Sequence, residues 1–379
     1  MTATMVCTMA PAATEATTKM HHVKADSGAG QPEPVHHPIQ EPAAARPGAA
    51  AAQLVRQPPC WRPVDDFEAT LGDYADCMLQ ACHAQSQRHL PAAASMAANV
   101  QKSDRELMLS WLVAVCGNLF DDTVLHSTIL QTDRYSAVAG EAMTMQALQM
   151  AMMAALCIVL KTSAPADRVW GRLPVRRLLN HILSGRATCE EIFATEHRVL
   201  QKLGFMVTAP TPLDLLDGLC TPPTPTQDGA ARPTASSAHS LASFLLQLSL
   251  FSVHVHYGYP HAILASSAAY VALASLRAPR ERLQALMGDT SAACPDVSEV
   301  PQRVADCMSV LHSLWHDFAV SGGHTAPCLL RKFGDVGIPA AVLLHPPPIS
   351  DVPHPAAIAR AVVDKTAGAV PAQALGVVA

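Results

Sequence analysis

Cysteine and histidine have the widest chemical scope in this sequence, because they bind metals and act as nucleophiles or bases. The chain contains 11 cysteines and 18 histidines. No two cysteines form a C-x-x-C pair, and His254 and His256 have no cysteine or carboxylate beside them at the spacing that zinc requires. We therefore expect free thiols in a reducing compartment, no metal site and no cofactor.

The sequence also lacks the motifs of the common catalytic sites. It has no P-loop, no G-x-S-x-G, no H-E-x-x-H and no protein-kinase signature. We predict that the protein is not an enzyme.

Lys161 and Glu196 are charged residues within strongly patterned segments. Lys161 ends an almost wholly apolar segment, where the dipole of a helix favours a cation. Glu196 interrupts a second patterned segment. On spacing alone, the simplest interpretation is that Lys161 ends a helix and that Glu196 lies on a solvated face.

The segments that carry these residues have helical periodicity. Apolar residues recur every three or four positions in Arg105–Leu119, and Ser103 or Asp104 can cap its start. Thr188 and Glu191 predict a capping box at the start of a later helix. The helices expected in the first half are Arg105–Leu119, Asp122–Tyr135, Met143–Lys161, Pro174–His181 and Thr188–Leu203. Those expected in the second half are Ser240–Leu250, Tyr259–Leu276, Arg280–Met287, Val300–Phe318 and Thr325–Phe333.

Each half includes one nearly all-apolar helix, which belongs at the centre of a bundle. The predicted fold is all-α, with two tandem five-helix bundles and a preceding N-terminal helix. The expected organisation is a disordered region at 1–60, an N-terminal helix segment at 61–98, a first bundle at 99–210, a second bundle at 211–345 with a linker insertion at 221–239, and a flexible tail at 346–379.

Composition limits the classes of partner. Half of the residues are apolar but only 4% are aromatic, which favours helices over strands. The net charge of −5 argues against a general nucleic-acid binder. The apolar run Ala147–Leu160 is shorter than the ~18 residues that indicate a membrane span, so we expect a buried helix. With no secretory signal evident, we expect a soluble intracellular protein.

Several fragments, in this order, resemble the cyclin family. DRELMLSWLVAV resembles the opening of the first cyclin box, TDRY its second helix and LQMAMMAALCIVLK its third. EEIFATEHRVLQKLGFMVTAPTPLDLL resembles the end of that box. FLLQLSL, YPHAILASSAAYVAL and LLRKF resemble the second box of A/B-type (mitotic) cyclins. The resemblance covers about Asp65 to Pro348.

The resemblance implies a regulatory subunit that activates a cyclin-dependent protein kinase and controls cell-cycle progression, in nucleus and cytoplasm. Lys161 and Glu196 match the family's kinase-binding lysine and glutamate, which hydrogen-bond the backbone of the kinase's regulatory helix. Arg105 and Asp133 match a buried structural pair. The implied partners are the kinase catalytic subunit and R-x-L-containing substrates or inhibitors, with no nucleic acid and no membrane.

The resemblance also implies a shallow apolar groove that docks R-x-L peptides. Its residues here are Leu107, Met108, Trp111, Leu148 and Gln149. Ala114 stands where the family has an acidic residue, which weakens the expectation. The alternative function is that of a transcription-factor-IIB-like DNA-binding protein with the same fold, although the sequence has neither a zinc ribbon nor a basic excess.

Overall fold

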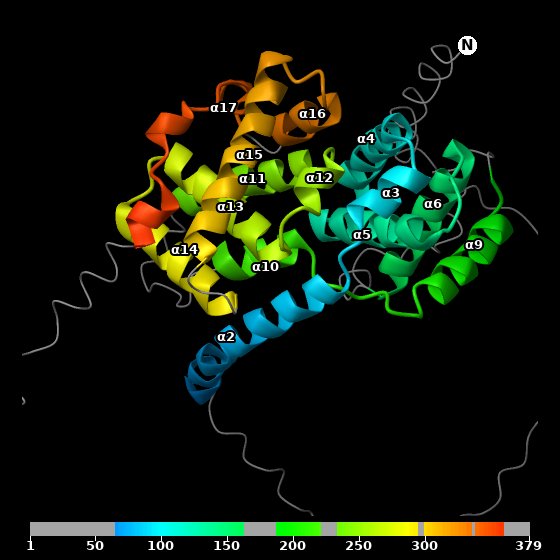
Figure 1. Cartoon of the computed structure of the whole chain (residues 1–379), viewed down its shortest axis with the longest axis horizontal. Coiled ribbons are helices and arrows are strands. Elements are labelled where there is room, and N and C mark those ends of the chain that lie inside the picture. The colour runs from blue at the N-terminus through cyan, green and yellow to red at the C-terminus, as the bar shows by residue number, and fades with distance from the viewer. Residues whose placement is uncertain (1–64, 163–186, 221–232, 295–298, 336–337, 360–379) are drawn as a thin grey trace, which may run out of the picture. The chain divides into compact units, whose positions relative to one another are not determined.

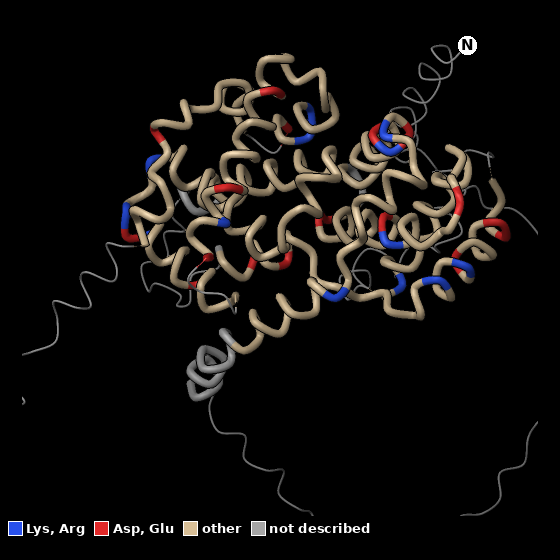
Figure 2. The backbone as a smooth tube through the Cα atoms, viewed as in Figure 1, with Lys and Arg blue, Asp and Glu red and all other residues tan. Residues whose placement is uncertain are grey.

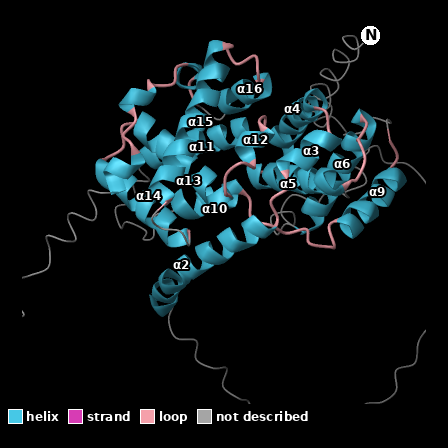
Figure 3. Ribbon diagram, viewed as in Figure 1, coloured by secondary structure: helices cyan, strands magenta, loops and turns pink. Residues whose placement is uncertain are grey.

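Every secondary-structure element in the described part of the chain is a helix, as predicted (Figure 3). The computed structural model describes residues 65–162, 187–220, 233–294, 299–335 and 338–359. The helices are α2 (Asp65–Arg88), α3 (Ala93–Asn99), α4 (Lys102–Leu119), α5 (Asp122–Val138), α6 (Met145–Thr162), α9 (Cys189–Lys202), α10 (Pro212–Cys220), α11 (Pro233–Ser249), α12 (Val253–His256), α13 (His261–Ser275), α14 (Arg280–Ala293), α15 (Val300–Val320), α16 (Pro327–Asp335), α17 (Ala340–Leu344) and the 3₁₀ turn η2 (Ile349–Asp351).

The two nearly all-apolar helices, α6 and α13, lie at the centres of their halves. α6 packs against α4, α5 and α9, and α13 packs against α10, α11, α14 and α15 (Figure 1). Residues 74–379 form one unit by their contacts, and one buried apolar cluster includes residues of α4, α5, α11 and α13. The two halves are therefore packed together.

α6 is longer than the apolar run that we expected. At 18 residues it is long and apolar enough to cross a membrane by length and composition alone. However, its residues from Ala151 to Leu160 are all buried within the protein. This is the environment of the predicted core helix.

Two helix starts differ from the prediction. α4 begins at Lys102 after Gln101, which makes no side-chain cap, so Ser103 and Asp104 lie within its first turn. α10 was not predicted, yet the carboxylate of Asp214 accepts hydrogen bonds from the backbone N–H and hydroxyl of Thr211, at 2.7 and 2.8 Å. The Asp214 N–H donates back to Thr211 Oγ1 at 3.3 Å, and this reciprocal cap explains why a helix follows the Pro-rich break.

Ordered structure occupies parts of the ranges that we expected to be a linker and a flexible tail. α11 starts at Pro233, so helix replaces the last part of the linker expected at 221–239. In the tail expected from 346, the apolar side chains of Val352 and Ile358 are buried in the main core, and Tyr270 donates a hydrogen bond to the carbonyl of Pro353 at 2.8 Å. Apolar anchors therefore hold residues that we expected to be flexible. The helix expected at Pro174–His181 lies outside the described residues.

Candidate functional site

Lys161 and Glu196 come together where α6 and α9 pack side by side. The Lys161 Nζ atom lies 2.7 Å from both carboxylate oxygens of Glu196. It also lies 5.0 Å from the centre of the Phe193 ring, a cation–π contact. The Lys161 side chain is 44% exposed and that of Glu196 is 12% exposed. The pair therefore combines a fixed geometry with a cation that a partner can reach.

The local sequence explains how these two side chains meet. Lys161 occupies the last turn of α6, directly after the buried core residues of that helix. Glu196 follows Ile192 by four residues and precedes Val199 by three, and both of those side chains are fully buried. On a helix these spacings share one face, so Glu196 lies at the edge of the packed surface of α9.

The capping box predicted at the start of α9 is confirmed. The Glu191 N–H donates to Thr188 Oγ1 at 3.2 Å, and the Thr188 N–H donates to Glu191 Oε2 at 2.8 Å. The hydrogen bond from the Thr188 backbone is the main cause that lowers the pKa of Glu191. α9 is thus acidic at its start and ends with basic Lys202, the order that the helix dipole favours (Figure 2).

An exposed apolar corner follows α9. Phe205 is 64% exposed and Met206 is 51% exposed. Gly204 and Phe205 have φ values of 58° and 60°, a left-handed conformation that is uncommon for a bulky residue such as phenylalanine. Our sequence analysis missed this feature, although Gly204 directly after an amphipathic helix is the usual signal of such a helix end.

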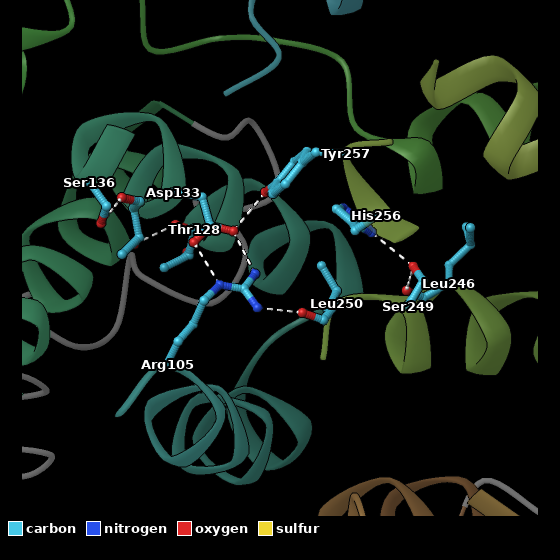
Figure 4. A network of polar contacts seen from close by, with 10 residues as sticks. Arg105, Thr128, Asp133, Ser136, Leu246, Ser249, Leu250, His256 and Tyr257 are labelled. Carbon is cyan, nitrogen blue, oxygen red and sulfur yellow. Dashed lines mark hydrogen bonds and ion pairs between the residues drawn. The ribbon is translucent and has the colours of Figure 1, made fainter. Parts of the chain in front are cut away.

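Arg105 and Asp133 form a buried ion pair between α4 and α5. Arg105 donates from Nε to Asp133 Oδ1 at 3.0 Å and from Nη2 to Oδ2 at 2.6 Å (Figure 4). The pair is also tied to the second half of the chain. Arg105 Nη1 donates to the carbonyl of Leu250 at 2.5 Å, and the Tyr257 hydroxyl donates to Asp133 Oδ2 at 2.7 Å.

Burial and charge oppose each other at this pair. Burial disfavours the charged form of Arg105, but the carboxylate of Asp133 outweighs it and the pKa of Arg105 is raised. Burial, reinforced by the charge of Asp133, raises the pKa of Tyr257 well above its ordinary value. A charged Arg105 and a neutral Tyr257 therefore both donate hydrogen bonds to the carboxylate of Asp133.

A second polar cluster links the halves and was not found from the sequence. Lys332 of α16 contacts Asp122 at the start of α5 and donates to Gln247 Oε1 of α11 at 2.9 Å. Gln247 Nε2 donates to Asp122 Oδ2 at 2.8 Å. In the sequence Lys332 lies within LLRKF, where no local pattern predicts a contact with Asp122.

Some residues of the predicted peptide groove are buried in the core, and others are partly exposed. Met108 and Leu148 are each 2% exposed and belong to the main core. Leu107, Trp111 and Gln149 are partly exposed. Leu107 and Trp111 are four residues apart and share a helix face, whereas Met108 is turned about 100° inward. The accessible part of the predicted groove is limited to Leu107, Trp111 and Gln149.

The histidines do not form a metal site in the described residues, where no group of three or more potential ligands could hold an ion. His256 is buried, while His254 is exposed. His126, His256 and His261 cluster in the interior, with ring centres 6.5 Å apart for His126–His256 and 6.0 Å for His256–His261. Burial lowers the pKa of His126 and of His261 to about 4, so these rings are neutral.

Comparison with known proteins gives a family for the first half. Residues 77–208, less than half of the chain, match the family described as "Cyclin, N-terminal domain". Over these residues the chain is cyclin-like. This cyclin-like region contains α4, α5, α6 and α9, and with them the pair Lys161–Glu196 and the pair Arg105–Asp133.

A search of curated proteins gave no match. Among solved structures, a viral cyclin from herpesvirus saimiri is similar with a TM-score of 0.42 and 15% identity, over 67% of this chain and 100% of that chain. Cyclins are regulatory proteins without catalytic activity, and the family match of the cyclin-like region thus supports the predicted non-enzymatic role.

Proposed function

We propose that this protein binds and activates a cyclin-dependent protein kinase as an A/B-type, mitotic cyclin with two cyclin boxes, in nucleus and cytoplasm. The observation that carries the proposal is the ion pair of the partly exposed Lys161 with the largely buried Glu196 at the edge of α6 and α9, within a region that matches the cyclin N-terminal domain. In the cyclins that the sequence resembles, residues at these positions hold the kinase.

The pair has the chemistry needed to bind the backbone of a partner helix. Lys161 carries three N–H donors, and its exposed ammonium can donate to carbonyl groups of the partner. The oxygens of Glu196 have further lone pairs that can accept from backbone amides. Both bonds are charge-assisted, and each member of the pair holds the other in position before binding.

The apolar corner supplies the other part of an interface. Phe205 and Met206 expose large apolar side chains directly after α9, the helix that carries Glu196. An apolar patch next to a few fixed polar groups is typical of a protein-binding surface. Binding that favours the inward position of the kinase's regulatory helix would shift its population toward the active state.

The test exchanges the two charges. In the double variant Lys161→Glu with Glu196→Lys, the internal ion pair is kept but donors and acceptors are reversed toward the partner. We expect unchanged helical circular dichroism and loss of both binding and histone phosphorylation, measured by pull-down with purified cyclin-dependent kinases.

A matched control exchanges a second exposed pair on another helix. Lys102 and Glu106 lie 3.7 Å apart on α4. Exchanging their charges makes the same chemical change in the first turns of α4, which carries neither Lys161 nor Glu196, and we expect kinase activation to persist. Full activation by the Lys161/Glu196 double variant would contradict the proposed interface.

A further inference from the structure

Arg134 of α5 is a buried cation that has no ion pair among the described residues. It is only 8% exposed. It donates to the carbonyl of Met206 at 2.7 Å and contacts His89 Nδ1 at 3.3 Å, and neither partner carries a negative charge. Burial lowers the pKa of Arg134, as expected for a cation that lacks a nearby carboxylate.

The neighbouring residue shows why the carboxylate is missing. Asp133 precedes Arg134 directly, but consecutive residues of a helix point about 100° apart. Asp133 therefore faces Arg105 and Tyr257 on one side of α5, whereas Arg134 faces the loop at Met206 on another. Within the described residues, a carboxylate pairs with the buried Arg105, and none pairs with Arg134.

Arg134 lines a cavity of about 410 Å³. This volume is within the range of sites that bind small molecules or side chains. The polar groups around it come from α2, α5, α10 and the loop after α9, and include Gln85, Ser127, Gln131, Arg134, Thr208 and Asp214. The Asp214 carboxylate is engaged by the N–H and hydroxyl of Thr211.

Gln131 adds an acceptor that needs a donor. Its Nε2 donates to the carbonyl of Val207 at 2.8 Å, but its buried Oε1 has no hydrogen-bond partner. A buried acceptor without a partner is costly, and a ligand that supplies an N–H would satisfy it. The cavity thus places the Arg134 cation about one helical turn from a buried acceptor that lacks a hydrogen-bond partner.

We propose that this cavity receives an anionic side chain, a carboxylate or a phosphate, of the protein that docks beside Lys161 and Glu196. The cavity is continuous with that face, since Val159 and Thr162 at the end of α6 and Val207 after the exposed corner also line it. The inference rests on the proposed function, because the partner is the kinase proposed above. The inference implies that the kinase has an acidic or phosphorylated residue on the surface that contacts this cavity.

The first test measures kinase binding. Arg134→Met removes the charge but keeps an apolar stem, and the cost of burying a cation disappears. We expect an unchanged melting temperature and at least a roughly tenfold weaker kinase affinity, the size of one lost charge-assisted hydrogen bond. Arg282→Met on α14 makes the same change in charge at an exposed position and should bind as wild type does. If Arg134→Met is destabilised and binds the kinase normally, Arg134 is structural and the inference is wrong.

The second test separates this inference from the proposed function. The Arg134 Nε–H signal is followed by NMR in the full chain while inorganic phosphate, or an N-acetylated aspartate amide, is added. We expect a saturable shift that is absent in Arg134→Met, and the stronger of the two probes identifies the anion. If no kinase binds the wild-type protein, the proposed function is wrong. If neither phosphate nor the aspartate amide shifts the Arg134 Nε–H signal, the inference of an anion site is wrong.

Discussion

Asp133→Asn tests the buried network that joins the two halves of the chain. The substitution keeps the shape of the side chain but removes its charge and turns one acceptor into a donor. The Arg105 and Asp133 side chains are only 6% and 4% exposed, so the guanidinium loses its counter-charge without gaining water. The single amide oxygen can accept from the Tyr257 hydroxyl and from one side of the guanidinium, but the other side of the guanidinium then faces an NH₂ group.

The expected cost follows from these contacts. Removing one partner of a buried ion pair costs about 3–5 kcal/mol, because the other charge remains buried and unpaired. Tyr257→Phe removes only the hydroxyl bond to a charged acceptor and should cost about 1.5–3 kcal/mol. The free energy of unfolding is measured by urea titration at 222 nm, with Asp335→Asn as an exposed control that we expect to stay within about 0.5 kcal/mol.

A rescue variant sharpens the same test. Replacing both charges together, with Arg105→Met and Asp133→Leu, leaves no buried charge and should cost less than Asp133→Asn alone. A loss below about 1 kcal/mol for Asp133→Asn would refute the reasoning, since it would mean that water reaches Arg105. The reasoning would also be refuted if the double variant Arg105→Met with Asp133→Leu were less stable than Asp133→Asn.

Three other predictions use the same urea titrations or a binding assay. The pKa values of His126 and His261 are lowered from 6.5 to about 4, so the stability that their neutral forms give is complete above pH 6.5 and is lost as the pH falls toward 4. The free energy of unfolding should therefore be lower at pH 5 than at pH 7 by about 2 kcal/mol per histidine. His126→Leu should remove the part of this pH dependence that comes from His126. Thr188→Ala should cost about 0.5–2 kcal/mol by removing the side-chain cap of α9, and equal stability of the variant and wild type would contradict the cap. A labelled R-x-L peptide should bind weakly and lose binding in Trp111→Ala; equal fluorescence titrations would show that the partly exposed Trp111 surface is not a docking site.

The helices of the fold could be predicted because their signals are local. Apolar spacing located α5, α6 and α15 to within a few residues, and the pattern T-x-x-E located the start of α9. α10 has an equivalent T-x-x-D signal at Thr211, but it is short and follows a Pro-rich break, so we interpreted that segment as a boundary. Buried tail residues such as Val352 are single apolar anchors, which periodicity does not detect.

The candidate site could be predicted only in part, because its contacts are long-range. Lys161 and Glu196 were paired through the resemblance, which supplied what spacing alone did not. The contact of Lys332 with Asp122 joins residues 210 positions apart, and no local pattern marks it. The unpaired state of Arg134 could not be predicted, because Asp133 precedes it directly in the sequence. Only the directions of the two side chains show that they do not pair with each other.

α5 carries residues of both polar clusters and of the cavity. At its start Asp122 contacts α11 and α16, in its middle Asp133 binds Arg105 and Tyr257, and one residue later Arg134 faces the cavity beside the exposed corner. The same helix packs against α6 and α9, which carry the Lys161–Glu196 pair. The second half contacts Asp122 and Asp133 of α5 through polar and buried groups, so it helps to hold this helix, and through it α6 and α9, in position. The polar contacts of α5 thus link the first-half helices that carry the Lys161–Glu196 pair to a second half with which they share the largest buried core.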